Sequence, residues 1–136
     1  MFALQFLVDK GQLDKTFEKT MYTTFLASSF RSLRFGVNEA HGRGQAIQLN
    51  YLMDQGAFKV NGDGTFSVDA AKIRDGVNAL TREIMTLQAE GSYAKAKQMI
   101  DTLGVLRPQA KAVLDKLTAV PVDIEPRFVT AIDLLK

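Results

Sequence analysis

The chain has 136 residues, of which 46% are hydrophobic and 24% charged, as is usual for one globular domain with one core. Its 17 basic and 15 acidic residues leave a net charge of +2, too weak a field to predict binding to nucleic acid or to an acidic membrane. Cysteine is absent, which excludes disulfides and thiolate metal sites and favours a reducing, cytoplasmic location.

The first residues, Met1 to Val8, are mostly apolar but too short for a membrane span or a signal peptide. They have the composition of a buried helix, yet no Ser, Thr, Asp or Asn precedes them as a cap. A chain that opens inside a hydrophobic element is expected of a fragment of a larger protein. A flexible or partner-bound terminus is the alternative.

Two long helices are predicted next. Apolar residues spaced by three and four over Leu13 to Arg34 indicate an amphipathic helix that ends at Gly36. Asn38 is expected to cap a second helix, which has Glu39 in its first turn and runs to about Gln55. The apolar face of the first of these helices consists of Phe17, Met21, Tyr22, Phe25, Leu26, Phe30 and Leu33.

Between Ala57 and Val68 the pattern changes to alternation around Asn61-Gly-Asp-Gly64, which predicts a β-hairpin. The same turn resembles a calcium loop at its odd positions. Phe66 and Lys72, however, stand where such a loop needs a glycine and a bidentate glutamate. Turn chemistry explains every residue here, so no metal site is predicted.

Three further helices are predicted in the second half of the chain. Asp69 is expected to cap the longest, about Ala70 to Glu90. A Gly-Ser pair at 91–92 separates it from a helix that ends at Gly104, and Pro108 begins a shorter one. The predicted inward stripes of these helices are Ile73, Val77, Leu80, Ile84 and Leu87; then Tyr93, Ala96, Ile100 and Leu103; then Val113, Leu114 and Leu117.

The C-terminal residues are predicted to be extended over Val120 to Pro126, since residues before proline avoid the helical region, and helical over Phe128 to Leu135. No internal repeat, low-complexity tract or linker divides the chain. The sequence therefore predicts an all-α fold, a single helical domain over residues 1–136. It should have about five to seven helices and one small β-hairpin near residues 57–68.

Motifs for self-contained catalysis are missing from the sequence. It has no Gly-x-Ser-x-Gly elbow, no phosphate-binding Gly-x-x-x-x-Gly-Lys and no His-Glu-x-x-His pair. His41 is the one histidine, so a multi-histidine metal site is impossible, and no nucleophile is legible beside it. An independent hydrolase is therefore not expected.

The first turns of the second predicted long helix have an unusual composition. Gly42 and Gly44 each cost about 1 kcal/mol relative to alanine there, but glycine lets another backbone or a ligand approach closely. His41, Gln45 and Gln48 are spaced to share one helix face rich in hydrogen-bonding groups. That face suits peptide-like groups, with His41 and Gln45 as candidate substrate-binding residues. A capped, partly buried histidine is the alternative.

Arg31 and Arg34 lie one helical turn apart just before this segment. They are candidates for binding a carboxylate or another anion. The alternative is that both compensate the C-terminal end of the first long helix. Their spacing leaves both interpretations open.

Three stretches of the sequence resemble the C-terminal part of the dipeptidyl peptidase III family of zinc peptidases, and its bacterial branch most closely. They are Phe30-Arg-Ser-Leu-Arg-Phe-Gly36, Glu39-Ala-His-Gly-Arg-Gly-Gln-Ala-Ile-Gln-Leu-Asn-Tyr-Leu52 and Gln55-Gly-Ala-Phe58. The resemblance continues through Asp63-Gly-Thr-Phe-Ser-Val-Asp69 and Leu87-Gln-Ala-Glu-Gly-Ser-Tyr93 to Pro121-Val-Asp123, and so covers nearly the whole chain. Its most specific element is the Ala-His pair with a glycine, Gly56, fifteen residues after the histidine.

This resemblance implies a two-lobed enzyme that removes dipeptides from peptide N-termini. Its zinc would be held by two histidines of a His-Glu-x-x-x-Gly-His helix and by a glutamate of a Glu-Glu-x-x-Ala-Asp-like segment. Neither motif exists in this sequence, and both would lie upstream in family order. This chain is therefore expected to bind no metal and to be inactive alone.

One functional residue of the family matches a residue here. The histidine of the family's Ala-His segment helps to bind substrate and to stabilise the transition state, and it corresponds to His41. Gln45 has no secure counterpart, and a basic residue that the family places further toward its C-terminus has no position that matches.

The expected partners are a peptide substrate in the intact enzyme and the missing N-terminal, zinc-bearing portion. The alternative is a free-standing helical interaction module that self-associates through its apolar N-terminus.

Overall fold

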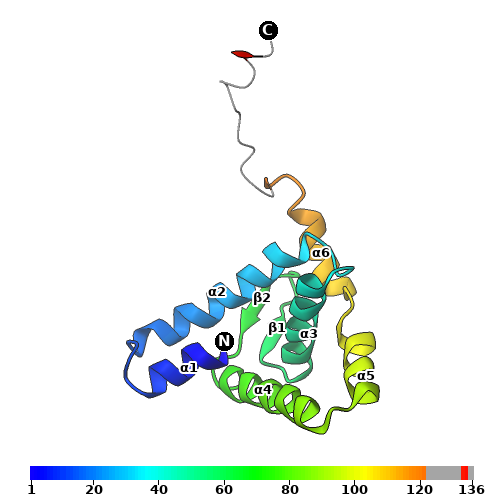
Figure 1. The fold of residues 1–136 in the computed structure, drawn as a ribbon. Helices are drawn as coiled ribbons and strands as arrows, with labels where there is room; N and C mark the ends of the chain where they lie inside the picture. Colours follow the sequence, from blue (N-terminus) through cyan, green and yellow to red (C-terminus); the bar gives the residue numbers. More distant parts are fainter. Residues whose placement is uncertain (122–132, 135–136) are drawn as a thin grey trace.

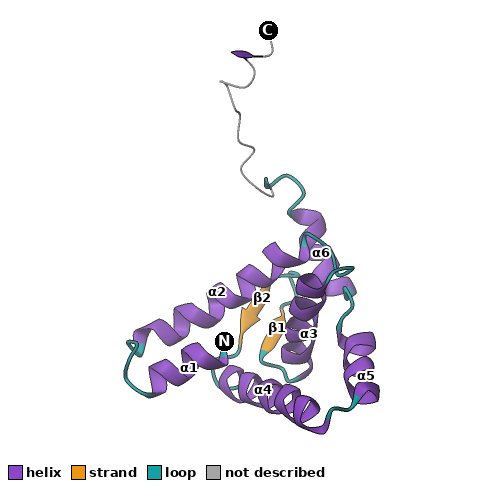
Figure 2. Cartoon of the chain, viewed as in Figure 1, coloured by secondary structure: helices purple, strands orange, loops and turns teal. Residues whose placement is uncertain are grey.

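The computed structural model describes residues 1–121 and 133–134, which form six helices and one two-stranded hairpin. In chain order the elements are α1 (Phe2–Asp9), α2 (Thr16–Leu33), α3 (Ala40–Asp54), β1 (Phe58–Val60), β2 (Phe66–Val68), α4 (Ile73–Glu90), α5 (Tyr93–Leu103) and α6 (Pro108–Lys116). Figure 1 shows the other helices arranged around α3, and Figure 2 shows the hairpin as a small strand region among helices. The predicted helical fold with one small hairpin is confirmed. The helix predicted over Phe128–Leu135, and the extended stretch beyond Pro121, lie outside the described ranges apart from residues 133–134.

The core forms where α3 meets α2, the hairpin and the beginning of α4. Ala46, Leu49 and Leu52 of α3 are each 1% exposed, and their spacing of three places them on one helix face. Phe30 of α2 packs edge-on against Phe66 of β2, with ring centroids 4.9 Å apart. A two-stranded hairpin is marginal alone, so its stability here depends on this packing against helices.

The hairpin forms as predicted. Its strands are antiparallel, and Phe58 lies opposite Val68. Thr65 donates hydrogen bonds to the Asp63 carboxylate from its hydroxyl at 2.7 Å and from its backbone N–H at 2.9 Å. These bonds, that of the hydroxyl above all, hold the pKa of Asp63 below its usual range. The Asp63 carboxylate, which resembled a calcium ligand in the sequence, therefore stabilises the turn.

Helix α4 begins three residues later than predicted, and Asp69 does not cap it. The Asp69 carboxylate accepts a hydrogen bond from the Ala71 N–H at 3.0 Å, which closes a turn before the helix. It also lies 2.6 Å from the Lys59 ammonium group. The prediction was wrong because an aspartate closes a local turn as readily as it caps a helix.

Three predicted apolar stripes are only partly buried. Tyr93 of α5 is 79% exposed, none of the α5 residues is buried, and Phe17 and Ile84 are exposed as well. Periodicity identifies the apolar face of a helix but not whether another element covers it. The predicted burial of Ile84 is therefore wrong, and the predicted apolar faces at Phe17 and Tyr93 are left uncovered within the described chain.

Helix α1 forms as predicted, without a side-chain cap, but its predicted burial is also wrong. Phe2 and Phe6 are exposed, whereas Gln5 and Val8 are buried. The Tyr22 hydroxyl donates a 2.6 Å hydrogen bond to the Gln5 side-chain oxygen, and the Gln5 amide donates to Asp9 at 3.0 Å. A short polar network therefore holds α1 against α2. None of the described helices is both long and apolar enough to cross a membrane.

Candidate functional site

Helix α3 begins with Glu39 as its cap, not with Asn38 as predicted. The backbone of Glu39 is extended, and its Oε2 accepts a hydrogen bond from the His41 N–H at 2.9 Å while its Oε1 accepts one from the Gly42 N–H. These two backbone bonds, that of His41 first, hold the pKa of Glu39 below its usual range. A carboxylate at this position also complements the positive end of the helix dipole. The prediction failed because the longer glutamate side chain is not among the preferred cap residues.

The two glycines near this cap have different roles. A Cβ at Gly42 would overlap the carbonyl oxygen of Gly36, a residue whose φ of +88° is itself easiest for glycine. Gly42 therefore permits the close backbone approach that the sequence predicted. A Cβ at Gly44 would meet nothing within 4 Å, so that position is open.

The His41 side chain is 99% exposed and points out from the first turn of α3. Its Nδ1 lies 3.3 Å from Glu39 Oε2. The alternative of a partly buried structural histidine is therefore wrong. When Nδ1 carries a hydrogen toward Glu39, Nε2 is left facing solvent, where it accepts a hydrogen bond in the neutral ring and donates one in the protonated ring.

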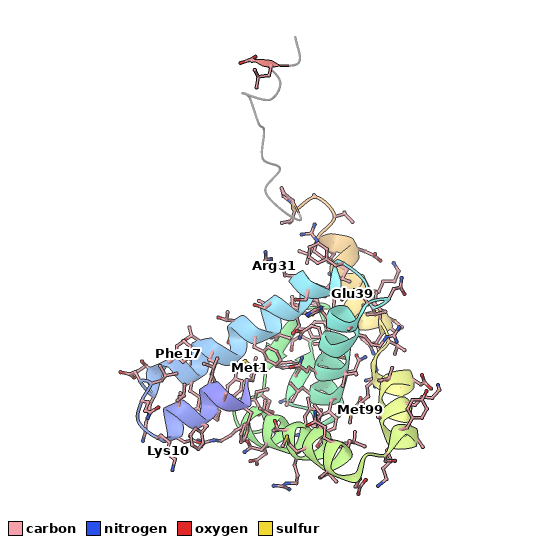
Figure 3. All side chains as sticks on the ribbon, viewed as in Figure 1. Met1, Lys10, Phe17, Arg31, Glu39 and Met99 are labelled. Carbon is pink, nitrogen blue, oxygen red and sulfur yellow. The ribbon has the colours of Figure 1, made fainter. Side chains whose placement is uncertain are left out.

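His41 lies in an open surface hollow of about 400 Å³. Figure 3 shows two residues of this hollow, Arg31 and Glu39, at the neighbouring ends of α2 and α3. The lining residues are Arg31, Ser32, Phe35, Glu39, His41 and Gly42. They place an imidazole, a guanidinium group, a hydroxyl and an exposed aromatic ring around one small volume, a combination that suits recognition of a peptide.

Gln45, the second predicted site residue, is directed elsewhere. Its side-chain amide donates a 2.8 Å hydrogen bond to the Ser29 hydroxyl, which in turn donates to the Phe25 carbonyl at 3.0 Å. Gln48 donates to the Gly44 carbonyl of its own helix at 3.2 Å. The structure thus places Gln45 between α3 and α2 and does not bring it into the hollow with His41.

Arg31 and Arg34 also differ, although the sequence treats them alike. Arg34 donates hydrogen bonds to the carbonyls of Val120 and Pro121, so its charge is used to hold the chain that follows α6. Arg31 lines the hollow and makes no ion pair within the described part of the chain. The carboxylate-binding interpretation therefore survives for Arg31 alone.

Sequence reasoning missed Ser32 and Phe35 as members of this site and assigned Glu39 only to the first turn. One signal for them was present. A connection of only a few residues between two long helices, with Gly36 in it, makes the helices neighbours. The end of α2 therefore had to lie beside the beginning of α3, where His41 stands.

The described residues contain no group of three His, Cys, Asp or Glu side chains that could hold a metal ion. A catalytic zinc takes three protein ligands from these residue types. The described residues therefore do not fit a zinc site.

Comparison with known proteins gives two solved structures that cover almost the whole chain. Dipeptidyl-peptidase III from Corallococcus sp. strain EGB is similar over 98% of this chain and 25% of its own, with 58% sequence identity and a TM-score of 0.88. The chain is therefore similar in fold and in sequence to one segment of that dipeptidyl-peptidase III. DPP III from Caldithrix abyssi matches 98% of the chain with 39% identity and a TM-score of 0.90, over 26% of its own length. The resemblance stated from the sequence is thereby confirmed.

The chain spans about a quarter of the length of these dipeptidyl peptidase III structures. A curated relative, Nudix hydrolase 3 from Arabidopsis thaliana, is 46% identical over 130 residues, which are 94% of this chain and 17% of that protein. That protein is much longer than this chain, and its name refers to a different hydrolase activity. No family model matches the sequence.

Proposed function

We propose that the chain is the C-terminal helical segment of a dipeptidyl peptidase III-like zinc peptidase of the cytoplasm, and that it is not catalytic alone. It contributes one wall of the peptide-binding site, and the remainder of the peptidase holds the zinc. The observation that carries the proposal is His41. Its exposed imidazole stands in a hollow, at the Ala-His pair of a segment that shares 58% identity with a dipeptidyl-peptidase III.

The geometry around His41 supports a role in binding the scissile peptide group. Glu39 lies 3.3 Å from Nδ1 and so orients the ring, while Nε2 is free to meet a ligand. A protonated ring that donates from Nε2 to a carbonyl oxygen binds it more strongly as negative charge develops there. His41 is the proposed substrate-binding residue. Gln45 supports it indirectly, by fixing α3 to α2 through Ser29.

Reconstitution tests this function. The chain is mixed with the remaining three quarters or so of the Corallococcus dipeptidyl-peptidase III, and release of arylamine from dipeptidyl-arylamides is measured with zinc present. We expect no turnover by the chain alone and turnover by the mixture. His41→Ala should lower kcat of the mixture about 100-fold, as loss of an oxyanion donor does.

Arg82→Gln serves as the matched control, because Arg82 is an exposed residue of α4 that lines a different hollow. It should leave kcat unchanged. Zinc-dependent hydrolysis by the chain alone would contradict the claim that it is not catalytic. An unchanged kcat of the reconstituted mixture after His41→Ala would contradict the role of the histidine.

A second candidate function, a self-associating interaction module, is favoured by the exposed phenylalanines of α1. Phe2 and Phe6 of α1 are exposed, as is Phe17 of α2, which lines a surface hollow together with Met1 and Leu4. Exposed apolar side chains gathered in one region mark interaction sites. In this case the chain should sediment as a dimer or larger species, and Phe6→Ser should restore a monomer. A monomer at all concentrations, before and after the substitution, argues against it.

A further inference from the structure

We propose that Arg31 forms a carboxylate-binding subsite beside His41, so that the peptide wall prefers ligands that carry a carboxylate. The inference rests on the proposed function, because it names the ligand chemistry of the same hollow. The carboxylate comes either from an acidic side chain or from the C-terminus of a short peptide. Both sources present the same planar anion, which a guanidinium group binds through two parallel hydrogen bonds.

Arg31 is the one of the two neighbouring arginines whose guanidinium group has no partner in the described structure. Its neighbour Arg34 holds the carbonyls of Val120 and Pro121, whereas Arg31 is exposed and makes no ion pair within residues 1–121. Its position in the last turn of α2 already suits a cation, because the negative end of the helix dipole lies there. The five N–H groups of its guanidinium are thus available to a ligand.

Arg31 shares the hollow with a hydroxyl group and an aromatic ring. The Ser32 hydroxyl has no hydrogen-bond partner among the described residues, and the Phe35 ring is 61% exposed. A bound carboxylate would find a cation and a hydroxyl donor, and the methylene groups next to it would find an aromatic wall. His41 lines the same hollow, where it could meet the peptide group of the same ligand.

Glu39 is the one acid in the hollow, and its position weakens its repulsion of an incoming anion. Both of its oxygens accept backbone hydrogen bonds from the first turn of α3, and Oε2 also faces the His41 ring. The positive helix end and the ring therefore offset its charge. The N–H groups at this helix end are already occupied by Glu39, so the guanidinium of Arg31 is the group that binds the ligand.

The test is an NMR titration of the isotope-labelled full chain with three tetra-alanine ligands. One is amidated and neutral at its C-terminus, one has a free C-terminal carboxylate, and one is amidated with a glutamate in place of the third alanine. Amide shifts at residues 31–44 report the hollow. The two carboxylate peptides should bind about fivefold more tightly than the neutral one, a gain expected of one exposed ion pair. The comparison of these two peptides identifies the favoured source of the carboxylate.

Arg31→Gln should abolish this preference, while Arg82→Gln should preserve it. Both substitutions lie at exposed positions, and an unchanged spectrum outside residues 31–44 verifies the fold. Raising the salt concentration should also reduce the preference, because exposed charges are screened. Equal affinity of all three peptides, or a preference that Arg31→Gln retains, overturns the proposal.

The outcome separates this inference from the proposed function. If His41→Ala lowers kcat of the reconstituted peptidase but Arg31→Gln leaves the preference for carboxylate peptides unchanged, the subsite is refuted and the proposed function stands. If Arg31→Gln abolishes the preference but His41→Ala leaves kcat of the reconstituted mixture unchanged, the proposed function is refuted and an anion-binding site remains.

Discussion

Helix α3 buries Leu49 and Leu52 and holds His41 in solvent, whereas helix α1 buries Gln5 and exposes Phe6. The arrangement of α3 is the ordinary one for a globular protein, with a polar functional group on a well-packed scaffold. The arrangement of α1 differs, since a polar side chain, Gln5, is buried beside Val8 while Phe2 and Phe6 are exposed. The apolar face of α3 is thus covered by the rest of the described chain, whereas the exposed phenylalanines of α1 are typical of a surface that binds another protein surface.

The largest expected effect comes from the glycine at the beginning of α3. Gly42→Ala places a methyl group onto the Gly36 carbonyl, and we expect a loss of about 3 kcal/mol in the free energy of unfolding, as for severe overpacking. Urea denaturation followed by circular dichroism measures it. Gly44→Ala is the matched control, because its flank is open, and it should stabilise the protein by up to about 1 kcal/mol. Equal effects of the two substitutions would contradict the backbone approach seen here.

The next largest effect tests how α3 holds the second half of the chain. Asn50 is 1% exposed and its amide donates hydrogen bonds to the carbonyls of Leu103 and Val105, each at 2.8 Å. Asn50→Ala removes this partner from both carbonyls and leaves a small cavity at a buried position, and a cost of about 2 kcal/mol is expected. Hydrogen exchange should show faster opening at α5 and α6 than at α2. Uniformly faster exchange in all helices would mean that Asn50 stabilises the core as a whole.

A smaller effect is expected for α1. Tyr22→Phe removes the hydroxyl that donates a hydrogen bond to Gln5. It should lower the free energy of local unfolding of α1 by about 1 kcal/mol, so that hydrogen exchange becomes faster only at the amides of residues 2–9. Burial, with a smaller contribution from Glu18, raises the pKa of Tyr22 to about 12. Because this pKa is above the unfolded value near 10, the stability that the Tyr22 hydroxyl contributes is present below about pH 10 and is lost as the pH rises toward 12. A base titration that leaves α1 equally protected in both proteins would disprove the anchoring role.

The smallest effect concerns the cap. The backbone N–H groups of His41 and Gly42 lower the pKa of Glu39 in the folded protein. The stability that the Glu39 carboxylate contributes is therefore present above its unfolded pKa and is lost as the pH falls through its folded pKa. In acid, the first turn of α3 should fray while Leu49 and Leu52 stay protected. Glu39→Gln should remove this pH dependence of the His41 and Gly42 amide shifts. A first turn that frays identically in the variant would rule out Glu39 as the cause.

Local signals in the sequence predicted most of the fold. Asn61-Gly-Asp-Gly64 predicted the hairpin, Gly91 and Ser92 marked the boundary of α4 and α5, and Pro108 marked the beginning of α6. These residues act through their own backbone and their nearest neighbours, so a sequence reveals them. Their effect does not depend on which other elements pack against them.

The rest depends on distant contacts and was less predictable. Gln5 and Asn50 are polar residues whose burial follows from Tyr22 and from the Leu103 and Val105 carbonyls, which no periodic pattern reveals. For the same reason the sequence grouped His41 with Gln45, which the structure directs away from it. The actual neighbours of His41 in the hollow come from the end of α2, across a turn.

The Glu39 carboxylate makes two contacts whose joint consequence concerns redesign of the site. One oxygen closes the first turn of α3 on Gly42, and the other holds both the backbone and the ring of His41. A designer who changes the charge beside the imidazole therefore also changes how the helix begins. Independent tuning requires that the cap first be moved, for example by Asn38→Ser with a rebuilt turn. Until then any library made at residue 39 will select for helix initiation and for histidine orientation together.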